Sequence, residues 1–314
     1  MHQSSKKLIS VVTPCLNEEA NVLECYQRIK KIFDQLPDYN YEHIYIDNAS
    51  TDKTVDLIKQ IVTKDKNIKL IVNSRNFGHI RSPFYGLLKA KGDAVMLLAS
   101  DLQDPPELIP DLIRKWEEGH KIVVGVKDQS DESALMFAIR KFYYQMASKI
   151  ANVALIKNFT GFGLYDQSVI KILQNIDDPY PYFRGLISEI GFDIAEVNFT
   201  QPTRKRGVTK NNFYTLYDMA MLGITSYSKI PIRLATMAGF GLSLLSFLMA
   251  IIFIFFKLFF WQHFSMGVAP ILIGLFFFSS VQLFFIGLLS EYIGAIHTQV
   301  LKRPLVIEKE RVNF

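Results

Sequence analysis

The sequence predicts an α/β protein with a mostly parallel sheet, followed by a pair of membrane-spanning helices. Three observations support this fold class. Short β-branched runs alternate with helical stretches in the first 130 residues, two long C-terminal stretches carry no charge, and polar residues follow the predicted strands. Alternating strands and helices form mostly parallel sheets of the nucleotide-binding, Rossmann-like kind. We therefore expect such a domain, joined to a transmembrane hairpin.

The predicted strands cover residues 8–13, 42–47, 68–72, 94–98 and 121–126, and the predicted helices cover 20–33, 54–63, 82–90 and 108–118. Ligands of parallel sheets bind at the carboxyl ends of the strands. Four of the predicted strands end in polar residues: Asn17, Glu18 and Glu19 after the first, Asp47 after the second, Arg75 and Asn76 after the third, and Asp101 after the fourth. This arrangement predicts a binding site at one edge of the sheet.

The fourth strand leads into the most informative stretch, Ala-Ser-Asp-Leu-Gln-Asp-Pro-Pro-Glu at residues 99–107. Asp101 and Gln103 leave the strand end with their side chains on the same side, Asp104 adds another oxygen, and two prolines force a turn. Oxygen ligands suit a hard divalent cation, and a cation in this place usually holds a diphosphate. We expect Asp101 and Gln103 to bind Mg²⁺ or Mn²⁺. The alternative role for Asp101 is to cap the helix that follows.

Two uncharged stretches, residues 234–256 and 266–290, are each long enough to cross a bilayer as a helix. Lys229 and Arg233 precede the first, and Lys302 and Arg303 follow the second. The positive-inside rule then puts both termini and the α/β domain in the cytoplasm. We therefore expect a multi-pass protein of the inner membrane. The alternative is a pair of buried core helices.

The chain has a net charge of +5, with cations gathered at 204–210 and beside the apolar stretches, so phosphates and lipid headgroups are the expected anionic partners. No basic helix with interleaved aromatic residues points to nucleic acid. Segments 134–155 and 213–230 are amphipathic and suit the membrane interface, with packing against the sheet as the alternative. We divide the chain into an α/β domain (1–211), an interfacial helix (212–230), a transmembrane hairpin (231–298) and a cytoplasmic tail (299–314).

Four motifs together resemble a known family. They are Val-Thr-Pro-Cys-Leu-Asn-Glu-Glu at 12–19, Ile-Asp-Asn-Ala-Ser-Thr-Asp-Lys-Thr at 46–54, Asn-Ser-Arg-Asn-Phe-Gly at 73–78, and Ser-Asp-Leu-Gln-Asp-Pro-Pro-Glu at 100–107. The combination resembles family 2 glycosyltransferases with the GT-A fold. With the hairpin, it resembles the polyprenyl-phosphate branch, which includes bactoprenol glucosyltransferases, the aminoarabinose transferase and dolichol-phosphate mannose synthases.

The resemblance implies a role for each matching residue. The residues implied to bind the nucleotide sugar are Pro14, Asn17, Glu18, Asp47, Asn76, Asp101 and Gln103, with Asp47 at the base. Many members carry an Asp two residues before Asp101, where this chain has Ala99, and a second acidic residue after Asp47, where it has Asn48. Helix capping by Asn17 and turn formation by Asp47 are the alternative roles.

Two further regions are implied to serve the acceptor. Residues 158–167 resemble the acceptor-side loop and carry Asp166, a candidate catalytic residue that acts as a base or orients the acceptor. Its alternative role is a helix cap. The loop Arg-Lys-Arg-Gly-Val-Thr-Lys at 204–210 is implied to meet phosphate through Arg204, Arg206 and Lys210, with Arg140 as a further candidate. A basic patch that only binds headgroups is the alternative.

These features together predict an inverting glycosyltransferase that moves one hexose, glucose from UDP-glucose as first choice, to undecaprenyl or another polyprenyl phosphate at the cytoplasmic face. The chain has no Gln-x-x-Arg-Trp sequence, which is typical of processive polysaccharide synthases. The alternatives are a mannosyl or aminoarabinosyl transferase, and a non-catalytic membrane partner of a flippase. The sequence leaves a homo-oligomer open.

Overall fold

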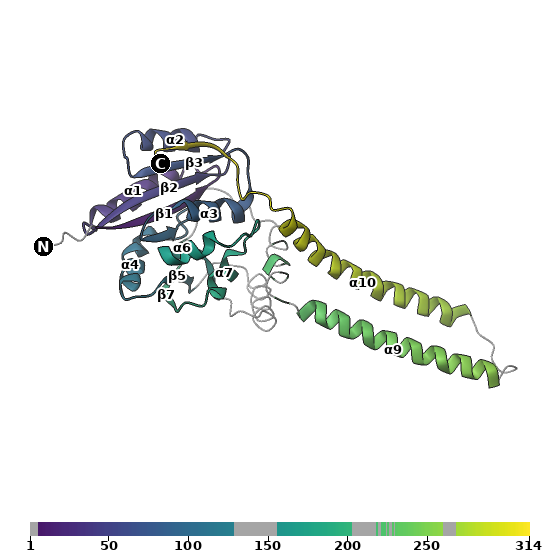
Figure 1. The fold of residues 1–314 in the computed structure, drawn as a ribbon. Helices are drawn as coiled ribbons and strands as arrows, with labels where there is room; N and C mark the ends of the chain where they lie inside the picture. The colour runs from purple at the N-terminus through teal and green to yellow at the C-terminus, as the bar shows by residue number, and fades with distance from the viewer. Residues whose placement is uncertain are drawn as a thin grey trace.

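The structure is a computed structural model that describes residues 6–128, 156–202, 218, 221–223, 225, 228, 230–259 and 268–314. A mixed sheet with helices on both faces forms the globular part, and two long helices project from it side by side (Figure 1). The described strands form one eight-stranded sheet in the order β7-β5-β6-β4-β1-β2-β3-β8. Only β6 and β8 run against the others.

The N-terminal elements agree with the sequence prediction to within a few residues. They are β1 (Lys7–Cys15), α1 (Val22–Asp34), β2 (Tyr39–Asp47), α2 (Thr54–Val62), β3 (Ile68–Asn73), α3 (Gly78–Lys89), β4 (Ala94–Leu97), a 3-10 turn (Pro106–Leu108), α4 (Ile109–Glu117) and β5 (Ile122–Lys127). Helix α3 begins four residues before the predicted start, and the backbone N–H of its first residue, Gly78, donates to the side-chain oxygen of Asn76.

The second half of the domain completes the sheet. It consists of β6 (Phe159–Asp166), α6 (Gln167–Gln174), α7 (Phe183–Glu189) and β7 (Ile194–Phe199). Apolar side chains of α1, α2 and α4 cover one face of the sheet, and those of α3, α6 and α7 cover the other. The central strands are therefore buried on both faces, as neighbouring Val11 and Val12 show with no exposed surface. Strands that are buried on both faces have nearly continuous apolar sequences, and this made them predictable.

Helix α3 lies unusually close to the sheet. A β-carbon on Gly86 would come within 2.7 Å of Val12 and 3.2 Å of Ile46, so only glycine permits this approach. The close contact fixes the start of α3 above the carboxyl ends of β1 and β2.

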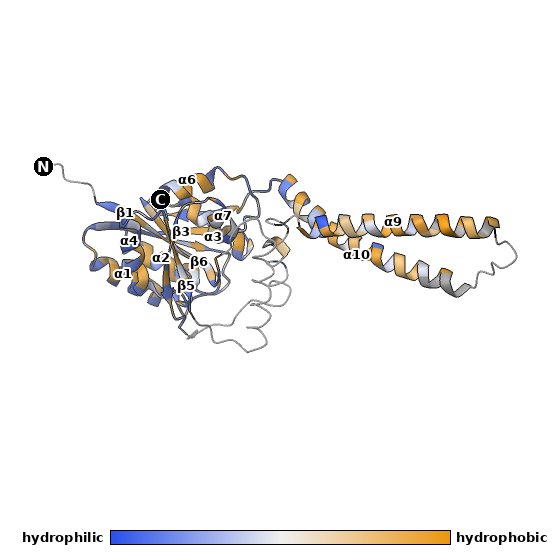
Figure 2. Cartoon of the chain, turned by 90° about the horizontal axis from the view of Figure 1, so that it is seen from below, coloured by the Kyte–Doolittle hydropathy of each residue, from blue (hydrophilic) through white to orange (hydrophobic). Residues whose placement is uncertain are grey.

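The two apolar stretches form α9 (Ile230–Phe259) and α10 (Val268–Val300). Figure 2 shows hydrophobic residues along both helices, well away from the sheet. Candidate membrane spans cover Ile230–Phe256 and Gly274–Val300, and neither is buried in the protein. The alternative of two buried core helices is therefore wrong. At the base of the pair, the hydroxyl of Tyr292 donates to the backbone carbonyl of Ser228 over 2.9 Å.

The chain returns to the sheet after the hairpin. Strand β8 (Glu308–Val312) pairs antiparallel with β3, and the C-terminus lies beside β3 in Figure 1. The segment that the sequence division sets apart as a tail therefore contributes a strand to the sheet of the α/β domain. The division missed it because four of the five β8 residues are charged, which hides the strand pattern. The salt bridge Lys59–Glu310 and the hydrogen bond from Tyr85 to Glu308 join its side chains to the domain.

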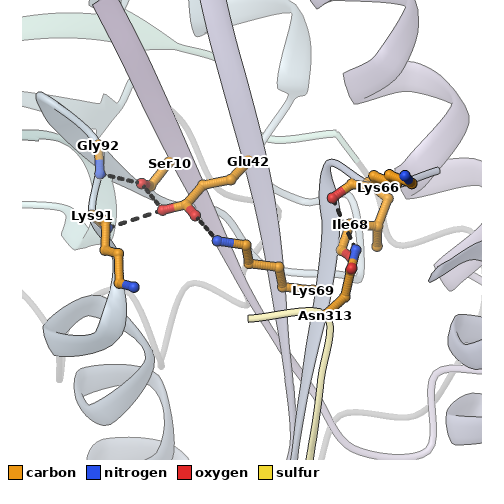
Figure 3. Close-up of polar contacts among 8 residues, drawn as sticks. All are labelled: Ser10, Glu42, Lys66, Ile68, Lys69, Lys91, Gly92 and Asn313. Carbon is orange, nitrogen blue, oxygen red and sulfur yellow. Dashed lines mark hydrogen bonds and ion pairs between the residues drawn. The ribbon is translucent and has the colours of Figure 1, made fainter.

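A buried ion pair ties the strands together at the opposite edge of the sheet from the site. Glu42 of β2 accepts hydrogen bonds from Ser10 of β1, from Lys69 of β3 and from the backbone N–H of Lys91 before β4 (Figure 3). Burial acts to raise the pKa of Glu42, but these donors together lower it. Asn313 lies beside this cluster and donates to the carbonyls of Lys66 and Ile68, which fastens the end of the chain.

Candidate active site

A cavity of about 540 Å³ lies at the carboxyl ends of β1 and β4. Pro14 and Cys15 line it from β1, and Ala99 and Asp104 from the segment after β4. The beginnings of α3 and α7 supply further lining residues, and Thr160 and Phe162 contribute from β6. The cavity therefore occupies the edge of the sheet that the polar strand ends predicted.

The loops after β1 and β2 are joined by hydrogen bonds around Asn17. The backbone N–H of Asn17 donates to the Ser50 hydroxyl over 2.9 Å, and its side-chain oxygen accepts from the N–H of Thr51 over 2.8 Å. Asn17 has a φ of 55°, in the left-handed region that Asn adopts more readily than most residues. Asn17 thus shapes the loop, whereas Pro14 and the next residue, Glu18, line the cavity itself.

Asp47 ends β2 with no exposed surface. Its carboxylate accepts from the backbone N–H of Ser50 over 2.9 Å and from the Ser50 hydroxyl. Burial raises the pKa of Asp47, and the hydrogen bonds from Ser50 oppose that rise. The turn role that the sequence left open for Asp47 is therefore present, and the residue is not among those that line the cavity.

Asn48 organises the loop that leads into α3. Its side-chain NH₂ donates to the side-chain oxygen of Asn76 over 2.8 Å and to the carbonyl of Gly78 over 3.1 Å. Its oxygen accepts from the N–H of Phe77 and from the side chain of Asn73. An ionised carboxylate at this position has no proton to donate, so the two bonds to Asn76 and Gly78 depend on an amide. Asn76, a predicted binding residue, is held in the cavity wall by this network.

The segment after β4 carries three oxygen-bearing side chains, Asp101, Gln103 and Asp104, and of these three only Asp104 lines the cavity. Asp101 accepts from the backbone N–H of Gln103 over 3.2 Å, and Leu102 between them has a φ of 59°. Asp104 is only 8% exposed and lines the cavity with Ala99. Burial raises the pKa of Asp104 to about 6; the charge of Lys127 lowers it and the neighbouring Asp101 raises it.

These donors fit a hard cation that completes its shell with substrate. No group of three or more His, Cys, Asp or Glu side chains converges on a point within the part of the chain that the structure describes. Mg²⁺ typically takes one or two protein carboxylates together with phosphate oxygens and water. Asp101 and Gln103, beside the buried Asp104, offer a donor set of this kind. Ala99 adds no donor.

Asp166 lies at the edge of the sheet opposite the cavity. It pairs with Ala94 at the beginning of β4, whereas the cavity lies beyond the end of that strand. Its carboxylate accepts from the backbone N–H of Ser168 as the cap of α6, and from the indole of Trp116 over 2.9 Å. The capping alternative is therefore present in the structure, the catalytic role of Asp166 stays a prediction, and the residue lies away from the cavity. The reason is that β6 runs antiparallel, so its last residue is far from the carboxyl ends of its neighbours.

The predicted acceptor residues Arg140, Arg204, Arg206 and Lys210 lie outside the described residues. Sequence reasoning missed two other residues of the cavity, His79 and Arg184. His79 follows directly on the motif at 73–78, and that position was a usable signal. Arg184 lies in the first turn of the short helix α7, and no motif of the sequence pointed to it.

Comparisons with known proteins agree with this geometry. The Glycosyl transferase family 2 family matches residues 10–173, which is more than half of the chain. The chain belongs to glycosyl transferase family 2. It is 32% identical to the SfII prophage-derived bactoprenol glucosyl transferase of Shigella flexneri, over 96% of this chain and 97% of that protein. It is also 32% identical to an uncharacterized glycosyltransferase of Bacillus subtilis (strain 168), YkcC, over 95% of this chain and 92% of that protein.

Family membership and these relatives place the chain in the branch of the bactoprenol glucosyl transferases, and the protein is a glycosyltransferase. A solved mycobacterial protein shares the fold, with a TM-score of 0.51 and 20% identity over 70% of this chain and 73% of that one. The fold is therefore GT-A, as the motifs predicted.

Proposed function

We propose that this glycosyltransferase transfers a single hexose, glucose from UDP-glucose as first choice, to a polyprenyl phosphate such as undecaprenyl phosphate. The observation that carries the proposal is the combination of a family 2 cavity at the strand ends with two unburied apolar helices beside it. A soluble acceptor would not require such helices. The bactoprenol glucosyl transferase of Shigella flexneri matches the chain through both parts.

In the proposed reaction, an oxygen of the acceptor phosphate attacks the anomeric carbon and forms a new C–O bond. The bond from that carbon to the nucleotide diphosphate breaks, its electron pair leaves with the diphosphate, and the configuration inverts. Bound Mg²⁺ or Mn²⁺ would neutralise charge on the departing diphosphate, and Asp101 and Gln103 are the residues that would hold it. Pro14, Asn17, Glu18, Asp47 and Asn76 would form or shape the nucleotide pocket.

In this proposal, residues 1–211 together with β8 form the cytoplasmic catalytic domain, residues 212–230 form an interfacial helix, and residues 231–298 hold it at the inner membrane. Arg140, Arg204, Arg206 and Lys210 are proposed to meet phosphate at the membrane surface. The acceptor phosphate is already anionic, so the reaction does not depend on a strong base.

A donor panel tests the proposal. Membranes containing the protein are incubated with undecaprenyl phosphate and one donor at a time: UDP-glucose, GDP-mannose or UDP-aminoarabinose. The masses of the lipid products are then measured by mass spectrometry. We expect a mass gain of one hexose with UDP-glucose. A gain only with GDP-mannose or the aminoarabinose donor supports the alternative sugars, and no glycolipid with any donor contradicts the proposal.

A further inference from the structure

The cavity has charged groups of opposite sign on different elements. Glu18 and Asp104 line it from the segments after β1 and β4, where a cation and the donor diphosphate are proposed to bind. Arg184 of α7 is the only Lys or Arg among the described lining residues, and His79 of α3 is the only histidine. A second anion that approaches a bound diphosphate therefore finds a positive group in Arg184 of α7, and the imidazole of His79 on α3 in the same lining offers a hydrogen bond.

Neither basic side chain is used by the rest of the described structure. The guanidinium of Arg184 and the imidazole of His79 have no hydrogen bond or ion pair with another described residue. Partial burial and the positive charge of Arg184 lower the pKa of His79, and the nearby Asp218 opposes this. A cation and an imidazole in one cavity lining, neither hydrogen-bonded through its side chain within the described part of the chain, are the donors that a phosphate group would use.

The elements that carry the pair are both fastened to the end of the second span. Gln299 donates to Asp178 over 2.8 Å and Lys302 pairs with Asp177 over 2.9 Å, just before the loop to Arg184. Arg81, two residues after His79, donates to the carbonyl of Pro304 over 2.7 Å. Figures 1 and 2 both show α3 and α7 on the side of the sheet that faces the hairpin. A lipid phosphate would reach the cavity from this side.

We propose that Arg184 and His79 form the subsite for the phosphate of the prenyl acceptor, separate from the acidic wall that serves the donor. The inference rests on the proposed function and deepens it, because it names the residues that distinguish the acceptor from its dephosphorylated form. Arg184 grips the phosphate with two parallel N–H donors, and His79 adds a single hydrogen bond.

The test uses the full-length protein in detergent and measures binding directly. Farnesyl phosphate and farnesol share the prenyl chain and differ only in the phosphate, and UDP reports on the donor side. The variants are Arg184→Ala, Arg184→Lys and His79→Gln. Arg114→Ala is the matched control, because Arg114 is an exposed arginine on α4 that pairs with Asp111.

We expect Arg184→Ala to lower the preference for farnesyl phosphate over farnesol by about 10- to 100-fold, the range for one charge-assisted contact. The affinity for UDP stays within about threefold of wild type, which also shows that the variant is folded. Arg184→Lys keeps the charge without the paired donors and loses less. His79→Gln loses a smaller factor, and Arg114→Ala changes neither ligand.

Three results overturn the inference. UDP affinity that falls while the farnesyl phosphate preference persists assigns the pair to the donor diphosphate. An unchanged preference in Arg184→Ala excludes a phosphate role. If that variant does not fold, an unchanged preference in both Arg184→Lys and His79→Gln is decisive. A wild type that makes no glycolipid defeats the proposed function alone, since the farnesyl phosphate comparison needs no turnover.

Discussion

At the scale of single residues, Asp101 carries the most direct prediction about activity. Replacing it with alanine removes one of the few oxygen donors after β4, so metal and diphosphate lose their common position. We expect Asp101→Ala to reduce transfer by at least about 100-fold with little change in melting temperature. The measurement is transfer at saturating Mg²⁺ or Mn²⁺, with exposed Asp111 of α4 as the site of a control substitution. Activity within a few fold of wild type would remove Asp101 from the site.

The hydrogen bonds of Asn48 predict that position 48 requires an amide and not a carboxylate. Asn48→Asp keeps the size but loses the two donated hydrogen bonds, to Asn76 and Gly78, and places oxygen against oxygen. Unsatisfied buried groups cost about 1–3 kcal/mol each, so we expect a clear fall in melting temperature and a higher KM for the donor. Asn40→Asp, on an exposed residue of β2, serves as control. Equal effects of the two substitutions would show that the loop network contributes nothing.

His43 links stability to pH. It is fully buried in β2, its Nε2 lies 2.9 Å from the Thr13 hydroxyl, and burial lowers its pKa to about 3. The unfolded chain therefore binds a proton below about pH 6.5 that the folded chain excludes, and folding stability falls as the pH drops from there toward 3.

At pH 5 the loss from His43 amounts to about 2 kcal/mol, from 1.36 kcal/mol per pH unit. We expect the melting temperature of the wild type in detergent to fall more between pH 7 and pH 5 than that of His43→Gln, which has no titrating ring. Parallel pH profiles for the two proteins would contradict this account.

At the scale of elements, β8 shows how a charged segment becomes a strand. The edge of β3 offers unpaired backbone groups, and β8 satisfies them, beginning with the N–H of Ser74, which donates to the carbonyl of Ile307 over 2.8 Å. Two of its charged side chains, Glu308 and Glu310, then contact Tyr85 and Lys59 of the domain. The open edge of β3 would otherwise be a site for aggregation.

Ending the chain after Arg303 should therefore lower the melting temperature by at least about 5 °C and increase aggregation. The measurement is a thermal melt in detergent with light scattering. Glu310→Ala removes one half-exposed ion pair with Lys59 and should cost less than about 1 kcal/mol. A truncated chain that melts within 2 °C of wild type would show that β8 adds no stability.

At the scale of the whole molecule, the hairpin and the catalytic domain are connected at both ends. Tyr292 donates a hydrogen bond to Ser228 at the base of the two helices. The chain therefore leaves the domain and returns to it at neighbouring positions, close to residues 233 and 291. A short Gly/Ser linker in place of residues 234–290 therefore removes the spans and keeps β8. A truncation at Pro231 removes both and does not separate their effects.

We expect the linker protein to bind UDP like the wild type and to transfer to a short prenyl phosphate with at most a modest loss. Transfer to undecaprenyl phosphate in vesicles should fall at least about tenfold, because the long chain stays in the bilayer and the domain no longer does. An equal loss with both acceptors would mean that the hairpin belongs to the catalytic core. The comparison is made at matched UDP affinity.

The central sheet and the hairpin were predictable because their signals are local. Apolar runs at β1 to β5 alternate with helices in a regular order. Each uncharged stretch of more than 20 residues is long enough to cross a bilayer as a helix. The cluster after β4 was predictable for the same reason, since Asp101, Gln103 and Asp104 lie within four residues. Asp166 could not be placed in this way, because its position depends on the direction in which β6 runs.

The sequence by itself thus determined the fold class, the edge of the sheet that carries the cavity, and the presence of two helices that could cross a membrane. Only the tertiary structure decided that Asp166 caps a helix, that Asn48 braces the loop into α3, that β8 joins the sheet, and that Arg184 and His79 share one wall. The physical reason is distance along the chain. Propensity and periodicity act over a few residues, whereas Lys59 meets Glu310 from 251 positions away through folding alone.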